Sequence, residues 1–137
     1  MTMASTGDGL IEWGVLSAAR VELGASFVRI LGYFREDGGK SVLQIEQAMR
    51  AGNAASMVIP AHTLKGEARQ FGAERLAMVA ESIEVIARDC VENHDAPEEA
   101  LEHVVGLRKL FQATLELLER EVNPLVERRP TFGRRAV

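Results

Sequence analysis

The chain has 137 residues, of which 47% are hydrophobic and 26% are charged, a composition typical of one globular domain. Its formal net charge of −4 argues against general binding to nucleic acid or to an anionic membrane surface. Cys90 has no second cysteine to pair with, residues 1–9 lack the pattern of a signal peptide, and no apolar run is long enough to span a membrane. We therefore expect a cytoplasmic protein.

The first half of the chain carries a series of helical patterns. Residues 1–9 are small and polar and are predicted to be flexible. A short apolar helix is expected over 10–19, and a second helix over 22–35, where apolar residues recur at helical spacing. The pair Gly38-Gly39 is expected to break or loosen the chain before the helical pattern resumes over 40–51.

The next helix is predicted over residues 54–71, with Gly52 as the stop of the preceding helix and Asn53 as the N-cap. Pro60 falls inside this segment. Because proline lacks a backbone N–H, it either bends the helix or marks a later start of it.

Two further helices are predicted, over residues 74–91 and 100–122, and the apolar stripe of the second includes Leu101. Between them, Asp95-Ala-Pro-Glu98 resembles a capping box, with the proline tolerated in a first helical turn. Residues 123–137 are predicted to be a flexible basic tail.

Several helices with short connections and no strand pattern predict an all-α fold. We expect an antiparallel four-helix bundle over residues 10–122, with the 10–19 segment as an extra short N-terminal helix. In a helical hairpin that turns at Gly72, positions equally distant from the turn lie opposite each other. Glu84 is therefore expected near the level of His62.

The helix with the strongest functional signal carries His62. At about 100° per residue, His62 points away from the apolar stripe of this helix. Lys65, Gly66 and Arg69 fall on the same outer side, and Val58 lies towards it. A neutral imidazole is a competent nucleophile, and cationic side chains offset phosphate charge. Glycine at position 66 costs about 1 kcal/mol of helix stability relative to alanine, but the missing side chain leaves open space one turn from His62. The apolar stripe consists of Met57, Ala61, Leu64, Ala68 and Phe71.

Each of these features also has a plainer interpretation. A single helical histidine is most often a surface residue, Gly66 can serve a close helix crossing, and Lys65 with Arg69 can be a solvated face. Enzyme sites are not indicated, because the sequence has no Glu-x-x-His pair, no zinc-type Cys/His cluster and no Walker loop. The sequence therefore predicts no metal site and no ATP-dependent kinase activity of its own.

The string His62-Thr-x-Lys65-Gly66, followed by Gly72-Ala73, resembles the signature of histidine-containing phosphotransfer (HPt) domains. The resemblance implies a four-helix bundle in which an exposed histidine, His62, is phosphorylated. In this family the histidine exchanges a phosphoryl group reversibly with the aspartate of a response-regulator receiver domain. The resemblance also implies that Lys65 helps to bind the phosphoryl group and that Gly66 gives access to it.

Further site residues follow from the resemblance, from the departures from it and from the outer face of the helix. Glu84 matches a position on the next helix where a polar residue can hold the second nitrogen of the histidine ring. The chain departs from the family pattern after the signature glycine, where Glu67 and Arg69 are large and charged. Arg69 is therefore a candidate second phosphoryl-binding cation. Val58, Glu67 and Gln70 are candidate docking residues for a partner.

We thus expect a monomeric phosphorelay protein whose partners are a receiver domain and, as a further candidate, a hybrid histidine kinase. The chain alone is expected to bind no cofactor, and the receiver domain to bring Mg²⁺ into the transfer complex. One alternative is an HPt-like adaptor that docks a kinase or receiver without transferring phosphate. A helical scaffold in which Gly66 serves packing is another.

Overall fold

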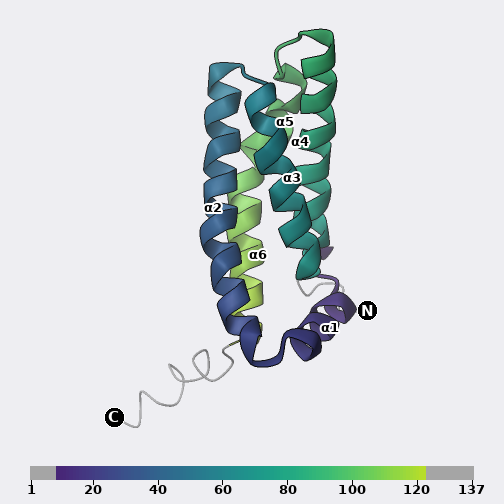
Figure 1. Cartoon of the computed structure of the whole chain (residues 1–137), viewed down its shortest axis with the longest axis vertical. Coiled ribbons are helices and arrows are strands. Elements are labelled where there is room, and N and C mark those ends of the chain that lie inside the picture. The colour runs from purple at the N-terminus through teal and green to yellow at the C-terminus, as the bar shows by residue number, and fades with distance from the viewer. Residues whose placement is uncertain (1–8, 123–137) are drawn as a thin grey trace, which may run out of the picture.

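The computed structural model describes residues 9–122, and within this range the chain forms helices and turns but no strand (Figure 1). Four long helices lie side by side as an antiparallel bundle, which confirms the predicted fold class. Their bounds are α2 Phe27–Ala51, α3 Ala55–Gln70, α4 Glu74–Asn93 and α6 Leu107–Val122. The segments predicted to be flexible, 1–9 and 123–137, lie outside the described residues apart from Gly9.

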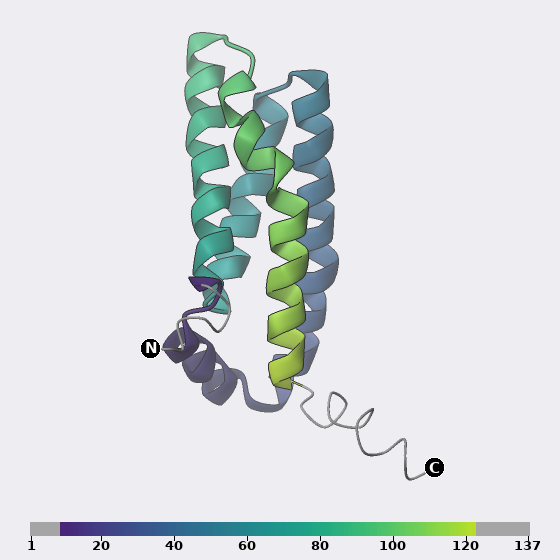
Figure 2. The same cartoon turned by 180° about the vertical axis from the view of Figure 1, so that it is seen from behind.

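Two shorter helices, α1 (Trp13–Leu23) and α5 (Leu101–Val105), complete the described part of the fold. The first lies across the end of the bundle at which α3 turns into α4, and the second leads from the opposite end into α6 (Figure 2). Each of them adjoins a 3-10 turn, Gly24–Ser26 after α1 and Glu98–Ala100 before α5. Within residues 9–122, no helix is both long and apolar enough to cross a membrane.

The N-terminal helix α1 starts and ends later than the expected range of 10–19. The Glu12 carboxylate accepts hydrogen bonds from two backbone N–H groups of the first turn, at 2.9 and 3.3 Å, which caps the helix. Gly24, with a φ of 53°, ends it. The extra helix exists as predicted, and its bounds are corrected to Trp13–Leu23.

Gly72 fixes α1 to the turn between α3 and α4. The Glu12 N–H donates to the Gly72 carbonyl at 2.6 Å. Gly72 has a φ of 74°, and a Cβ at this position would lie 2.6 Å from the Glu12 carbonyl oxygen. Both the backbone conformation and the close approach of α1 therefore require glycine here.

Helix α2 continues through Gly38-Gly39, so the predicted break is wrong. A Cβ on Gly38 would lie 2.6 Å from the Phe111 ring of α6. The absence of that Cβ lets α6 pack closely against α2. This contact offsets the low helix propensity of glycine, and the two expected helices of 22–35 and 40–51 are parts of one.

Helix α3 spans Ala55–Gln70, one residue shorter at each end than the expected 54–71, and its cap position is Ala54 rather than the expected Asn53. Gly52 ends α2 with a φ of 65°, and the Asn53 side chain accepts a hydrogen bond from the Ser56 N–H at 3.1 Å. Pro60 lies inside α3 and is buried. The alternative of a helix that starts at Pro60 is therefore wrong, and the expected facing of Met57 is confirmed by its complete burial.

The C-terminal part differs more from expectation. Asp95 forms no cap: residues 95–97 are irregular, Pro97 precedes a 3-10 turn, and no side chain caps that turn. The single helix expected over 100–122 is divided into α5 and α6 at Gly106. Leu101, expected in the apolar stripe, is half exposed. Because α5 and α6 are separate helices, the apolar periodicity of α6 does not extend to Leu101.

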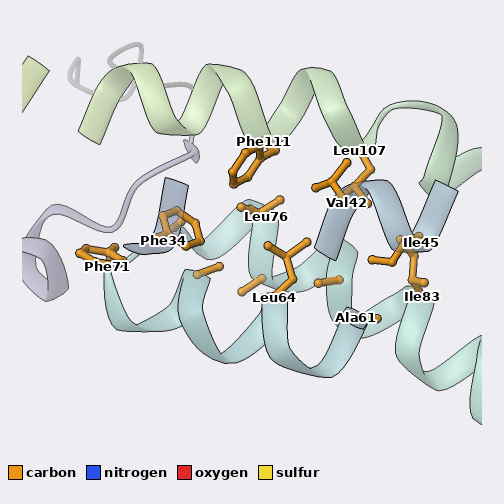
Figure 3. Close-up of a cluster of buried hydrophobic side chains, with 14 of the residues drawn as sticks. Phe34, Val42, Ile45, Ala61, Leu64, Phe71, Leu76, Ile83, Leu107 and Phe111 are labelled. Atoms are coloured by element: carbon orange, nitrogen blue, oxygen red, sulfur yellow. The ribbon is translucent and has the colours of Figure 1, made fainter. Parts of the chain in front are cut away.

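The core lies between the four long helices and holds the His62 helix in place (Figure 3). The Phe34 ring of α2 packs 5.3 Å from the Phe71 ring and 5.6 Å from the Phe111 ring, measured between centroids. The predicted buried stripe of α3 is confirmed, because all five of its side chains are at most 1% exposed. Each large apolar side chain buried in this way stabilises the fold by about 1.5–3 kcal/mol.

Candidate functional site

His62 lies on the outer face of α3, as the sequence predicts, and its side chain is 58% exposed. One turn further along α3, Lys65 lies on the same side of the helix but is mostly buried. The buried stripe on the opposite side fixes the rotation of the helix about its axis, so the imidazole is held at the surface.

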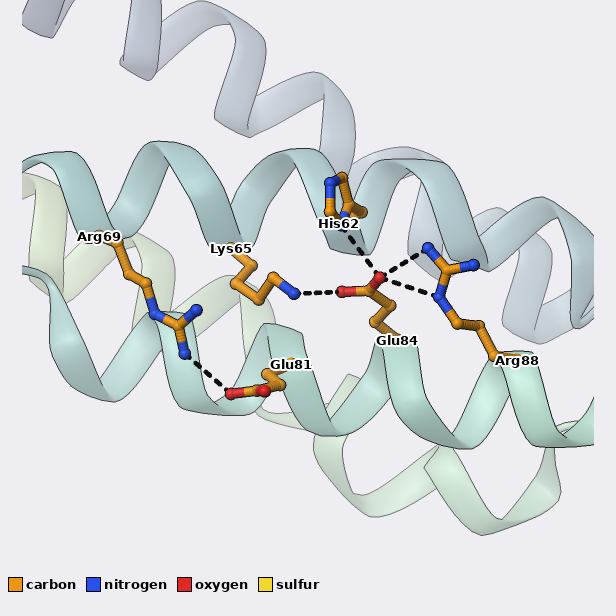
Figure 4. Close-up of polar contacts among 6 residues, drawn as sticks. All are labelled: His62, Lys65, Arg69, Glu81, Glu84 and Arg88. Carbon is orange, nitrogen blue, oxygen red and sulfur yellow. Dashed lines mark hydrogen bonds and ion pairs between the residues drawn. The ribbon is translucent and has the colours of Figure 1, made fainter.

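Glu84 of α4 lies directly beside the histidine (Figure 4). Its Oε2 is 3.0 Å from His62 Nδ1, and its Oε1 is 2.8 Å from Lys65 Nζ. The Glu84 side chain is only 7% exposed, so this carboxylate is a buried group at the base of a surface site. The position expected for Glu84 from the hairpin geometry is thereby confirmed.

Arg88 is a fourth member of this cluster, and the sequence analysis missed it. Its Nε and Nη2 donate to Glu84 Oε2 at 2.9 and 2.8 Å (Figure 4). The available signal was the spacing of Glu84 and Arg88 on one helix, since oppositely charged residues four apart are neighbours on a helix surface.

The charges around Glu84 decide which ring nitrogen carries the hydrogen. Burial raises the pKa of Glu84, but hydrogen bonds from Lys65, Arg88 and His62 outweigh it and lower the pKa to about 2. The carboxylate is therefore ionised at neutral pH and can only accept hydrogen bonds. His62 Nδ1 must then be the donor, which leaves the lone pair of a neutral ring on Nε2.

Gly66 leaves open space beside the imidazole. A Cβ built at this position would meet no heavy atom within 4 Å, and the residue is exposed. This argues against a close helix crossing at Gly66, whereas Gly38 does serve such a crossing. The glycine clears a path along α3 towards the ring.

Arg69 does not reach the Glu84 cluster. Its Nη2 lies 2.8 Å from Oε1 of Glu81 on α4, one turn further along the bundle, and both side chains are about half exposed (Figure 4). The candidate docking residues are spread along α3. Val58, one turn before His62, is partly buried against the core, and Gln70, the last residue of the helix, is exposed.

Glu67 is turned towards α2 rather than fully outward. Burial raises its pKa to about 7, and the charge of Asp37 on α2 adds to the rise. The Glu67 Oε1 atom is buried and has no hydrogen-bond partner. An ionised Glu67 is therefore unfavourable in the folded protein.

We expect Glu67→Gln to stabilise the protein above pH about 7 and to have little effect below pH 4.5. A carboxyl with a raised folded-state pKa contributes stability below its ordinary value of 4.5, and this contribution is lost as pH rises towards 7. Thermal unfolding at both ends of this range measures the difference. The control is Glu116→Gln on an exposed position of α6, and an equal rise in Tm for both variants at every pH would contradict the expectation.

Among residues 9–122, no three His, Cys, Asp or Glu side chains come together as a potential metal site. Around His62, the charged side chains are two cations and one carboxylate that both cations already contact. Such a set of groups suits an anion better than a divalent cation.

Comparisons with known proteins give the family and the fold. The family model described as the Hpt domain matches residues 29–122, so α1 lies outside the matched region. A crystal structure of histidine-containing phosphotransfer protein B (HptB) from Pseudomonas aeruginosa PAO1 is similar in fold, with a TM-score of 0.72. Its sequence identity is 22%, and the match covers 82% of this chain and 93% of that one. A comparison with curated protein sequences found no match. The chain belongs to the Hpt domain family, the histidine phosphotransfer domains of two-component signalling.

Proposed function

We propose that this protein is a phosphocarrier that reversibly exchanges a phosphoryl group between His62 Nε2 and the aspartate of a response-regulator receiver domain. The observation that carries the proposal is the 3.0 Å contact between His62 Nδ1 and the ionised Glu84. It fixes the hydrogen on Nδ1 and leaves Nε2 free on an exposed helix face. A cytoplasmic location and a monomeric state belong to the same proposal.

The transfer step uses this arrangement directly. The Nε2 lone pair attacks the phosphorus of the receiver's aspartyl phosphate, the N–P bond forms as the O–P bond breaks, and the aspartate carboxylate leaves with the electron pair. The ring keeps its hydrogen on Nδ1 and becomes positively charged. Glu84 offsets that charge, as a buried carboxylate does for a catalytic imidazolium. The reverse step follows the same path.

Two cationic side chains near the His62 ring, Lys65 and Arg88, offset the charge of the phosphoryl oxygens in this proposal. Lys65 is mostly buried against Glu84, whereas Arg88 is 56% exposed, and in the proposed step Arg88 turns from Glu84 towards the phosphoryl group. Arg88 thus takes the role first considered for Arg69, which is paired with Glu81. The charges beside His62 do not fit a divalent cation, so Mg²⁺ belongs to the receiver.

The test is a transfer experiment with isolated receiver domains that have been phosphorylated in the presence of Mg²⁺. Wild-type protein is expected to take up label that is acid-labile and alkali-stable, and His62→Gln is expected to take up none. His103→Gln, which removes another helical histidine, is the matched control and is expected to behave as wild type. Incubation with ATP alone is expected to give no label.

Two outcomes would contradict the proposal. Label on His62→Gln at the wild-type level would place the phosphoryl group elsewhere. Tight binding of a phosphorylated receiver without transfer would instead support the adaptor, an HPt-like protein that docks a receiver or a histidine kinase without accepting phosphate.

A further inference from the structure

We infer that the receiver domain docks over the half of α3 that precedes His62. In this orientation, apolar side chains of the receiver, next to the receiver's aspartate, pack on Ile59. This inference rests on the proposed function and adds to it the orientation of the partner. Ile59 is 68% exposed and lies three residues before His62, on the same outer part of the helix. Together with Val91 of α4, which is 42% exposed and lines the same hollow, Ile59 forms an apolar patch of the kind that partner proteins cover.

Ile59 lies between two hollows of the surface and projects between them. Between α3 and α4, a hollow of about 500 Å³ lies against Val58, Ile59, Arg88 and Val91. Between α2 and α3, a second hollow of about 520 Å³ extends from Ile59 and Pro60 to Ala51 and Gln47. Val91 is also substantially exposed, so apolar surface continues from α3 onto α4. A ridge between two hollows can interdigitate with side chains of a partner surface.

The opposite flank of His62 has a different chemistry. There the surface presents the ion pair between Arg69 and Glu81, both about half exposed. Exposed pairs of this kind contribute little to affinity, whereas buried apolar anchors contribute most of it. The flank before His62 thus combines exposed apolar side chains with the charges of Arg88 and Glu92, and it favours tight packing, whereas the flank after His62 presents an ion pair that favours orientation and selectivity.

The transfer chemistry explains why a receiver must cover this surface. In-line attack requires the phosphorus to approach Nε2 to about 3–3.5 Å. A protein of ordinary interface size buries about 800 Å² on each partner, so it cannot reach His62 without covering residues one helical turn away. Ile59, at that distance on the apolar side, is therefore inside the interface. Arg88 lines the adjoining hollow, which places the docking surface and the phosphoryl-binding cation next to each other.

The experiment compares Ile59→Ser with two controls in transfer from a phosphorylated receiver that labels the wild type. Ile59→Ser is expected to raise KM about tenfold and to leave kcat nearly unchanged. Val105→Ser, at a 73% exposed position of α5, is expected to match the wild type. Arg69→Ser, on the charged flank, is expected to raise KM less than about fivefold. All three positions are exposed, so unchanged Tm values serve as the check on folding.

Three results would overturn the inference: a wild-type KM for Ile59→Ser, an equal increase for Val105→Ser, or a larger increase for Arg69→Ser than for Ile59→Ser. A loss confined to kcat would also overturn it, because docking would then be intact. These failures differ from a failure of the proposed function, in which the wild type itself takes no label from any receiver. Binding of the receiver to His62→Gln, with and without Ile59→Ser, gives the same comparison without transfer.

Discussion

Replacing Gly66 with leucine is expected to reduce phosphoryl transfer to His62 more than about 100-fold while leaving the fold intact. A Cβ at Gly66 would meet no heavy atom within 4 Å, so the new side chain can start without a clash, and its outer carbons are expected to fill the path to the ring. A displacement of about 1 Å in the reacting groups is enough for a rate loss of this size. Because leucine favours helix over glycine, the Tm should stay the same or rise. Transfer kinetics and thermal unfolding of the same preparation measure both effects.

Two other glycines of the bundle provide matched controls. Gly39→Leu, at another open helical position, should also keep or raise the Tm and should leave transfer unchanged. Gly38→Leu should lower the Tm sharply, since a Cβ there would already meet the Phe111 ring at 2.6 Å. If Gly66→Leu destabilised the protein as Gly38→Leu is expected to do, Gly66 would be a packing residue and its proposed role in access would be wrong.

Glu84→Gln is expected to slow transfer about 10–100-fold. The amide keeps the size of the carboxylate and can still accept a hydrogen bond from His62 Nδ1, but it cannot offset the positive charge of the phosphorylated ring. The amide also has an NH2 group, which can face Nδ1 in place of the carbonyl oxygen, so the ring loses its single preferred tautomer. Transfer rates measure the first effect, and nitrogen NMR of the imidazole measures the second. Unchanged rates with an unchanged tautomer would contradict the role given to Glu84.

The same substitution has a pH signature in stability. The pKa of Glu84 falls from its ordinary 4.5 to about 2, because hydrogen bonds from Lys65, Arg88 and His62 outweigh the burial that raises it. A carboxyl with a lowered folded-state pKa contributes its stability above 4.5, and this contribution is lost as pH falls towards 2. Glu84→Gln should therefore destabilise most above pH 4.5 and progressively less below it. A penalty that stays constant down to pH about 2 would contradict this assignment.

The sequence could predict the parts of the site that depend on one helix or on one hairpin. The buried stripe of α3, the stop at Gly52 and the level of Glu84 follow from helical periodicity and from the turn at Gly72. Periodicity sets the direction of each side chain, and a helical hairpin with a known turn pairs residues across it.

What the sequence could not predict depends on contacts between distant segments. Gly38 looks like a helix breaker until Phe111, from the last helix, is packed against it. Glu67 appears to face outward until α2 covers it and brings Asp37 near. Arg69 is a plausible second cation in the sequence, and only the packing of α3 on α4 shows that it pairs with Glu81 instead.

The most direct measurement of the central claim is phosphorus NMR on protein with isotope-labelled histidine nitrogens, recorded after incubation with a phosphorylated receiver. The account predicts a one-bond nitrogen–phosphorus coupling to Nε2 of His62, with the hydrogen still on Nδ1 beside Glu84. Phosphorus on Nδ1, on another residue, or on the receiver alone would contradict it.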